Sequence, residues 1–425
     1  LVRSTPRHRN ARVPRDPGRT LDLQCTPVTI PQSPPPDIVI RNGFVVDGSG
    51  APGFEGEVVL RGERIVGVGA VGSHDLEPGT EVVDATGCWV TPGLIDPHTH
   101  LDAQLCWDPT GSPSNHHGVT TVVMGLCGFG VAPCPADGGE YLLRSLEVVE
   151  EIPYGSTSLG VPFSWRSWRE FRDHIADQPL GVNAAGFVPH SALRFFAMGD
   201  RARTDVATPA DIDRMVDELR DALAAGAIGF ATSRGPNHVD GYQQPVPSRV
   251  ADETELAALV GACTDRLWQI NVETKFSHDA EALTSEVARY AAWTRDANAR
   301  LTWTPFYAEP GETVWRDVLE HNRGLNDSGV SVSPQITTVP ITLLLRFDER
   351  SFLTAVNGWQ EALKGFFRLP PDGRIERLLD PEVRASMKRA EGDPLDPLTP
   401  DFHQWTFTYV PSCPELGGRT VAAAA

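Results

Sequence analysis

Two histidines end the segment Pro92-Gly-Leu-Ile-Asp-Pro-His98-Thr-His100. Residues two apart on a β-strand point to the same side, so both imidazoles can face one metal ion. Chance alone gives about 0.3 His-x-His pairs in a chain of this composition, so the spacing by itself is weak evidence. The pair follows an apolar segment that we expect to be the first strand of a parallel sheet, where functional groups gather at the strand ends. This position favours metal binding by His98 and His100 over the alternative, two surface histidines.

A cysteine follows the next expected strand. The run Val119–Met124 has the pattern of a buried strand, and glycines lead from it to Cys127. A thiolate at this place would lie on the same face as the two histidines, and a nearby metal ion would keep it deprotonated. Residue chemistry alone leaves the alternative, an inert buried cysteine, equally open.

Two further strand ends each carry a histidine and an arginine. His190 and Arg194 follow the expected strand 181–187, and Arg234 and His238 follow the expected strand 227–231. The planar guanidinium of arginine binds a carboxylate through two parallel hydrogen bonds. We predict that these four residues bind substrate. An exposed loop histidine with a structural arginine is the alternative at each place.

The order of the elements predicts an α/β fold. Residues 37–90 contain short β-branched runs separated by glycines, which predict a small antiparallel sheet. Beyond them, apolar strands alternate with helices, as in the helix that begins at Thr208, has Pro209 in its first turn and ends before Gly226. Such repeats predict right-handed βαβ units and a parallel sheet. A (β/α)₈ barrel needs eight strands, whereas we expect seven, near 89–96, 119–125, 182–188, 227–231, 267–272, 301–305 and 330–336.

Composition excludes several classes of function. The 425 residues carry a net charge of −19, which argues against nucleic acid and anionic membranes as partners. No apolar run reaches the length of about 18 residues that a membrane helix needs. The 7 cysteines include no CxxC pair, so a disulfide framework is not expected and a reducing, cytoplasmic location is favoured. Residues 1–36 are rich in Arg and Pro and predict a disordered leader.

Several segments together resemble a known family. They are Asp37-Ile-Val-Ile-Arg-Asn-Gly, Pro92-Gly-Leu-Ile-Asp-Pro-His-Thr-His, Gly118-Val-Thr-Thr-Val-Val-Met-Gly-Leu-Cys-Gly, Pro189-His-Ser-Ala-Leu-Arg, Gly229-Phe-Ala-Thr-Ser-Arg and Pro334-Gln. In this order they resemble the amidohydrolase superfamily, and within it the N-acyl-D-amino-acid deacylase (D-aminoacylase) branch. The resemblance implies a zinc-dependent TIM-type barrel with a β-sandwich module. It also implies hydrolysis of the amide bond of small N-acyl amino acids.

The resemblance also implies roles for individual residues. His98 and His100 would be first-strand metal ligands, and Cys127 would be the family's metal-ligand cysteine. The cofactor would be Zn²⁺, with one or two ions. His190 and Arg194 match a segment of the active face, which agrees with substrate binding. Residues 37–90 would form part of the sandwich, and 91–425 an incomplete metal-dependent barrel.

Three departures from the family pattern are visible. The family places a metal-binding histidine after strands five and six, but residues 269–275 and 302–306 contain none, so His238 or Glu273 is a candidate substitute. Leu126 stands where an asparagine commonly precedes the family cysteine. The family's catalytic aspartate follows the eighth strand and has no counterpart before the resemblance ends near Gly418. We therefore expect a chain truncated at its C-terminus, and we can name no catalytic residue.

Three functions are compatible with these features. The first is a metal-dependent deacylase of N-acyl amino acids. The second is an inactive fragment or pseudoenzyme of the same family, whose open sheet edges would favour a homo-oligomer. The third is a cyclic-amide hydrolase of the hydantoinase or dihydroorotase type.

Overall fold

The computed structural model describes residues 38–149, 152–236, 238–242, 244–273, 279–306, 313–336, 346–348, 352–356, 358–389, 402–403 and 405–424. The leader expected at residues 1–36 lies outside the described residues. The chain divides into two compact units, which meet in sequence between Leu94 and Ile95. No described helix combines the length and the apolar character that crossing a membrane requires.

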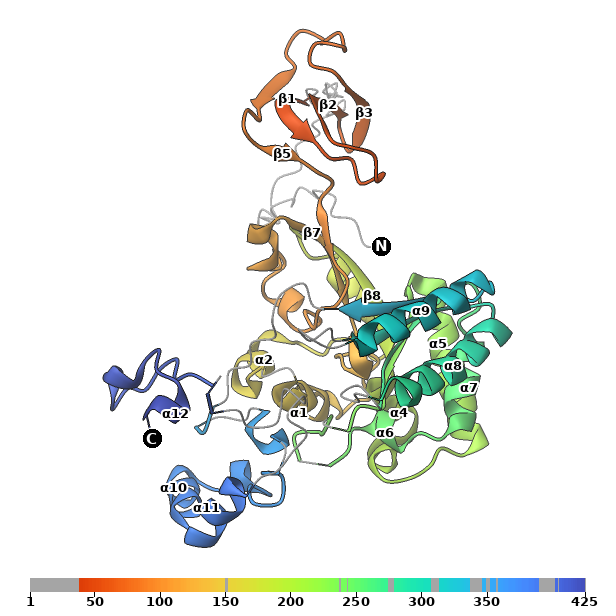
Figure 1. Ribbon diagram of the computed structural model, residues 1–425. Helices are drawn as coiled ribbons and strands as arrows, with labels where there is room; N and C mark the ends of the chain where they lie inside the picture. The colour runs from red at the N-terminus through yellow and green to blue at the C-terminus, as the bar shows by residue number, and fades with distance from the viewer. Residues whose placement is uncertain are drawn as a thin grey trace, which may run out of the picture. The chain divides into compact units, whose positions relative to one another are not determined.

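The smaller unit contains one five-stranded sheet among its described residues (Figure 1). Its strands are β1 (Ile38–Val45), β2 (Phe54–Arg61), β3 (Arg64–Gly69), β4 (Glu81–Asp84) and β5 (Trp89–Val90). β1 pairs antiparallel with β2, and β2 pairs antiparallel with β3, as expected. β4 and β5 instead run parallel to β1, so the expectation of a purely antiparallel sheet is wrong. The reason is that the chain between β3 and β4 makes a crossover connection and not a hairpin. A parallel pair of strands requires such a crossover.

The larger unit is built on a seven-stranded sheet in the order β12-β11-β10-β9-β8-β7-β6. The strands are β6 (Leu94–Asp96), β7 (Val119–Met124), β8 (Asn183–Pro189), β9 (Gly229–Ser233), β10 (Leu267–Asn271), β11 (Arg300–Phe306) and β12 (Val332–Ile336). Every pairing from β7 to β12 is parallel. The sheet curls as expected for an incomplete (β/α)₈ barrel, which confirms the predicted fold class.

The strand expected at residues 89–96 is two strands. β5 pairs with β1 in the smaller unit, whereas β6 belongs to the larger sheet. Pro92 and Gly93 separate them, because proline lacks the N–H that a ladder needs and glycine favours a break. The expectation of one continuous strand here is wrong, but the histidine pair still follows the first strand of the parallel sheet.

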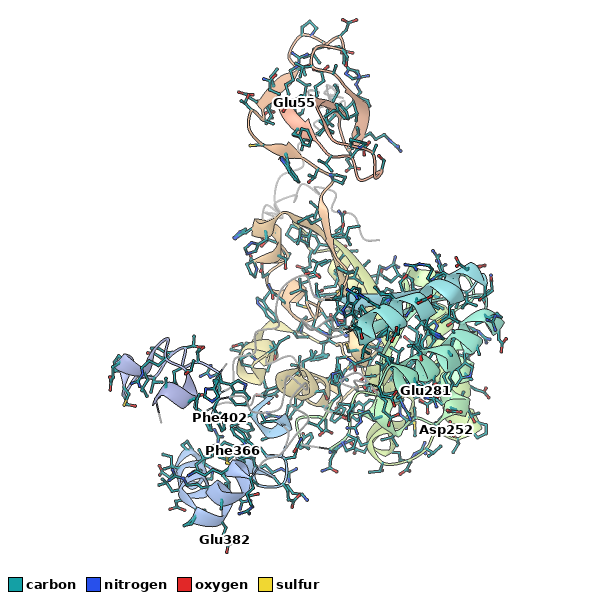
Figure 2. All side chains as sticks on the ribbon, in the orientation of Figure 1. Glu55, Asp252, Glu281, Phe366, Glu382 and Phe402 are labelled. Carbon is teal, nitrogen blue, oxygen red and sulfur yellow. The ribbon has the colours of Figure 1, made fainter. Side chains whose placement is uncertain are left out.

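Helices follow the strands of the larger unit (Figure 1). Thr208 and Asp211 form a capping box at the start of α5, and Gly226 ends this helix in the left-handed conformation, as the sequence predicts. Asp252, labelled in Figure 2, caps α7 by accepting a hydrogen bond from the N–H of Glu255. The helices are α1 (Gly139–Val149), α2 (Tyr154–Gly160), α3 (Trp168–Ala176), α4 (His190–Met198), α5 (Pro209–Ala225), α6 (Pro247–Val250), α7 (Glu253–Gly261), α8 (Ala280–Asp296), α9 (Val314–Asp327), α10 (Pro371–Leu379), α11 (Pro381–Lys388) and α12 (Val421–Ala424).

Alternation along the strands separates the core from the interior of the curled sheet. The Trp268 indole is fully buried and donates a hydrogen bond to Thr294 on α8 (2.9 Å). The Trp303 indole is bonded to Asn322 on α9 in the same way (3.1 Å). Because side chains alternate between the two faces of a strand, the neighbour Gln269 points to the opposite face, into the curled sheet. A smaller, separate core contains Phe366, whose side chain is labelled with that of Phe402 in Figure 2.

Gly229, the first residue of β9, provides a test of this packing. A Cβ there would overlap the backbone carbonyl oxygen of Leu267 on the neighbouring strand. We expect Gly229→Ala to lower the free energy of unfolding by at least about 1–3 kcal/mol, measured by urea denaturation. Gly324 on α9 has open space where a Cβ would lie, so Gly324→Ala is the control and should stabilise by about 0.5–1 kcal/mol. Equal stability of Gly229→Ala and the wild type would contradict the packing of β9 against β10.

Candidate metal centre

Three predicted ligands converge at the carboxyl edge of the sheet. His98 and His100 follow β6, and Cys127 lies in the turn after β7. One ligand atom of each residue lies within 4.8 Å of the other two. Sγ of Cys127 is 3.2 Å from Nε2 of His98. Among the described residues this is the one cluster of three or more His, Cys, Asp or Glu side chains with such spacing.

Cys127 occupies a backbone turn that few residues adopt. Its φ is 53° and its ψ is 13°, in the left-handed region, with Gly125 and Gly128 also at positive φ. A non-glycine residue there costs about 1–3 kcal/mol and persists when its surroundings hold it. The N–H of Cys127 donates a hydrogen bond to Oε1 of Gln269 on β10 (2.8 Å). This bond, between residues far apart in the sequence, holds the turn that directs the thiol at His98.

Asp102 holds the same turn from another side. Its carboxylate accepts a hydrogen bond from the N–H of Gly125 (3.1 Å). Burial raises the pKa of Asp102 to about 7, and the bond from Gly125 opposes that rise. The carboxyl group lies two residues beyond His100 in the sequence and therefore belongs to the surroundings of the ligands.

Three carboxamides surround the ligands, and none of them was predicted as a site residue. Besides Gln269, the side chain of Asn271 places Nδ2 3.9 Å from the Cys127 sulfur. Oε1 of Gln335 on β12 lies 2.7 Å from Nδ1 of His98. The sequence does contain one indication for Gln269 and Asn271. They alternate along the strand with the outward-facing Trp268, so both belong to the inner face.

The donor atoms fit a transition metal ion. One thiolate and two imidazole nitrogens suit zinc and similar ions, whereas calcium and magnesium prefer oxygen ligands. Two buried atoms of these carboxamides, Nε2 of Gln269 and Oδ1 of Asn271, make no hydrogen bond within the described part of the protein. A buried polar atom without a partner is a place where a bound ion or water can supply the missing interaction.

His190 and Arg194 lie in a buried network. Both side chains are fully buried with Glu255. Nε2 of His190 is 2.6 Å from Oε1 of Glu255, and its Nδ1 is 2.7 Å from Oγ1 of Thr232. Arg194 forms an ion pair with the other oxygen of Glu255. The protein itself therefore binds these polar groups, and their predicted role in substrate binding stays a prediction.

Protonation in this network follows from burial. Burial lowers the pKa of His190, so the neutral ring donates from Nε2 to Glu255 and accepts from Thr232. Burial alone would raise the pKa of Glu255, but the hydrogen bond from His190 and the charge of Arg194 lower it. Acidification therefore lowers the stability of the folded chain through both His190 and Glu255. Below about pH 6.5 the unfolded chain binds a proton at His190 that the folded chain does not bind, which favours unfolding. The stability that the ionised Glu255 contributes is lost as the pH falls through its lowered pKa.

His238 and Arg234 lie near the metal ligands but outside the cluster. Nδ1 of His238 is 2.7 Å from Oγ of Ser233. The His238 ring packs 5.2 Å from the ring of Phe129, which in turn lies 6.5 Å from the ring of His100. Neither His238 nor Glu273 belongs to the three-residue cluster. Their proposed substitution for the family's other histidines therefore stays a prediction.

Arg234 is accompanied by a second arginine that sequence analysis missed. Arg234 donates to the carbonyl of Ala251 (2.6 Å), and Arg249 donates to the carbonyl of His238 (3.1 Å). Both side chains are half-buried. Within the described part of the chain, neither guanidinium forms an ion pair with a carboxylate. Nothing in the spacing of Arg249 from Arg234 signals this arrangement, because Arg249 lies on the short helix α6 and the segment between β9 and α6 has no regular period.

Comparison with known proteins gives the family. A family model described as the amidohydrolase family (Amidohydro_3) matches residues 81–308, more than half of the chain. The chain belongs to the amidohydrolase family. This confirms the resemblance that the motifs carry, and the matched segment contains all seven predicted site residues.

Individual relatives fall in the deacylase branch. An N-acyl-D-aspartate deacylase of Alcaligenes xylosoxydans xylosoxydans is 37% identical over 198 residues, which are 46% of this amidohydrolase chain and 36% of that protein. An N-acyl-D-glutamate deacylase of the same organism is 34% identical over 231 residues, 54% of this chain and 42% of that protein. The amidohydrolase chain thus spans less than half the length of these curated relatives.

A solved structure is similar as well. It is the N-acyl-D-glutamate deacylase from Bordetella bronchiseptica, complexed with zinc and a phosphonate inhibitor. It is 28% identical, with a TM-score of 0.57, and the match covers 72% of this chain and 59% of that one. Together with the family match, this structure supports a divalent metal ion as the cofactor of this amidohydrolase.

The network around Glu255 gives a stability prediction. Glu255→Gln leaves the buried guanidinium of Arg194 without its counter-charge, so we expect the free energy of unfolding to fall by about 3–5 kcal/mol. Asp221→Asn is the matched control. It breaks the exposed pair of Arg169 with Asp221 (2.8 Å) and should cost no more than about 1 kcal/mol. Similar urea midpoints for the two variants would show that the buried network is not structural.

Proposed function

We propose that this amidohydrolase chain carries the metal-binding part of a zinc-dependent deacylase. The reaction is hydrolysis of the amide bond of a small N-acyl amino acid, giving the free amino acid and a carboxylate. The observation that carries the proposal is the convergence of His98, His100 and Cys127 at the carboxyl edge of the sheet, with one ligand atom of each within 4.8 Å of the others. Membership of the amidohydrolase family supports it.

His98, His100 and Cys127 would hold the ion. When bound, zinc supplies a Lewis acid that polarises an amide carbonyl and stabilises the negative charge that develops on its oxygen. The residues around it hold the two kinds of ligand in place. Gln269 fixes the turn of Cys127, and the amide of Asn271 approaches its sulfur. We propose a single zinc ion per chain, because the end of the fifth strand presents the carboxamide of Asn271 where the family pattern has an imidazole.

Arg234 and Arg249 are proposed to bind the carboxylate of the substrate. An N-acyl amino acid has a free α-carboxylate, and a half-buried guanidinium without an ion-pair partner is the group that binds it best. Arg234 directly follows β9, and its N–H donates to the carbonyl of Asn271 (2.8 Å), whose side chain approaches Cys127. Arg234 is therefore connected to the metal ligands through the ends of two adjacent strands.

Zinc binding tests the first part of the proposal. We expect His98→Ala to reduce the zinc content of the purified chain from about one ion per chain to background, measured by elemental analysis, because two remaining ligands bind zinc poorly. His321→Ala, on the outer helix α9, is the control and should keep its zinc. Unchanged zinc in His98→Ala would show that the ion lies elsewhere or that the chain binds none.

Substrate binding tests the second part. We expect Arg249→Leu to raise the Kd of the zinc-loaded chain for N-acetyl-D-glutamate and N-acetyl-D-aspartate by about 10–100-fold, measured by titration calorimetry, because it removes a hydrogen bond to a charged group. Arg169→Leu, an exposed arginine paired with Asp221, is the control. An unchanged Kd for Arg249→Leu contradicts the carboxylate site. Hydrolysis of a hydantoin in preference to linear amides would favour a cyclic-amide hydrolase, and zinc binding without any turnover would favour an inactive member of the family.

A further inference from the structure

Gln335 connects two strands at opposite ends of the strand order. It lies on β12, the seventh strand of the larger sheet, whereas His98 follows β6, the first strand. Oε1 of Gln335 is nevertheless 2.7 Å from Nδ1 of His98, across 237 residues of sequence. Pro334-Gln335 is also one of the segments that resemble the amidohydrolases.

The chemistry of this hydrogen bond determines which nitrogen of His98 carries the proton. A carbonyl oxygen accepts and cannot donate, so Nδ1 must be protonated to make the bond. In a neutral imidazole the other nitrogen, Nε2, then carries the lone pair. Nε2 is the nitrogen that lies 3.2 Å from the Cys127 sulfur, within the ligand cluster. The bond to Gln335 therefore presents the lone pair of His98 to the metal position.

The barrel architecture explains why these two side chains meet. Inward-facing residues of alternate strands share one layer in a (β/α)₈ barrel. β6, β10 and β12 are the first, fifth and seventh strands of the sheet. All three are odd-numbered, so their inward side chains share the same layers of the barrel interior. Gln269 on β10 binds the backbone of Cys127, and Gln335 on β12 binds the ring of His98. Cys127 and His98 are thus each fixed by a glutamine from a strand far away in the sequence.

We propose that Gln335 is a positioning residue for the metal site: its side-chain carbonyl holds His98 in the Nδ1–H tautomer and aims Nε2 at the ion. The inference rests on the metal site of the proposed function and adds to it the residue that orients one ligand. Outer hydrogen bonds of this kind change metal affinity by about 10–100-fold when they are removed. Gln335 contacts a ligand and not the reacting groups, so it acts through His98.

Zinc alone is the probe for affinity, measured on the full chain by competition with a chromophoric chelator. Gln335→Leu keeps the size of the side chain but removes the acceptor, and we expect its Kd for zinc to rise by about 10–100-fold. Gln335→Glu keeps an acceptor and should bind zinc at least as tightly as the wild type. Gln178→Leu is the matched control, because it removes a half-buried glutamine bonded to a backbone carbonyl far from the metal ligands in sequence. Equal zinc affinity of Gln335→Leu and the wild type would overturn the proposal.

The tautomer of His98 is a second readout, and it is measured on the wild-type protein. In ¹⁵N-histidine-labelled, metal-free wild type at about pH 8, where a free imidazole is neutral, the His98 signals should show a protonated Nδ1 and an unprotonated Nε2. His98→Ala identifies these signals by their loss. A wild-type His98 protonated on Nε2 contradicts the proposal even if the zinc site itself exists. Of the His98 and Gln335 variants, only His98→Ala is expected to lose zinc binding to background. Unchanged zinc in His98→Ala would therefore mean that the metal site is wrong, whereas unchanged zinc affinity in Gln335→Leu alone would mean that only the positioning role is wrong.

Discussion

The metal centre depends on one hydrogen bond, from the backbone N–H of Cys127 to the side chain of Gln269. Without a partner of this kind, a cysteine at a φ of 53° would relax toward an ordinary conformation and turn its thiol away from His98. Gly125 makes the approach possible, since a Cβ at that position would overlap the carbonyl of Phe187 on β8. The sulfur ligand is therefore held by the second, third and fifth strands together. Its position is a property of the curled sheet as a whole and not of the loop that contains it.

The same strands provide both the stability of the larger unit and the polarity of its interior. Trp268 and Trp303 bury their indoles against the outer helices and bond to Thr294 and Asn322 there. Burial of an aromatic side chain contributes about 1.5–3 kcal/mol, which offsets the cost of placing an amide on the opposite face. Gln269, one residue from Trp268, carries that amide. Substituting it would affect the site first and the outer core only indirectly.

The sequence predicts some of these features well and others not at all. The histidine pair, Cys127 and the strands before them are local patterns, because a strand and the residue that follows it are adjacent in sequence. The network of His190 and Arg194 is different: their partner Glu255 lies on another helix, and only the packing of α4 against β9 and α7 brings the charges together. A histidine that follows a strand has the same local sequence whether it faces a cavity or a buried carboxylate. Glutamine and asparagine amides likewise occur on any surface. The contact of Gln335 with His98 can therefore be recognised only in the folded chain, where the first and seventh strands come together. Hydrophobic patterns with a period of two or 3.6 residues predict strands and helices, but they do not predict contacts between distant side chains.

Charge determines which anion can approach this site. The chain has a net charge of −19, so its long-range field repels a carboxylate substrate. Physiological salt screens that field beyond about 8 Å, and the local groups then decide binding. The charge of Arg194 is already paired with that of Glu255 inside the protein. Among the described residues, neither Arg234 nor Arg249 forms an ion pair with a carboxylate, although the charge of Glu273 acts on Arg249. Together with a divalent ion, the two arginines would make the carboxyl edge of β9 and β10 locally positive. An anionic substrate of low charge and small size fits this combination better than a polyanion, because only the last few ångströms of its path are attractive.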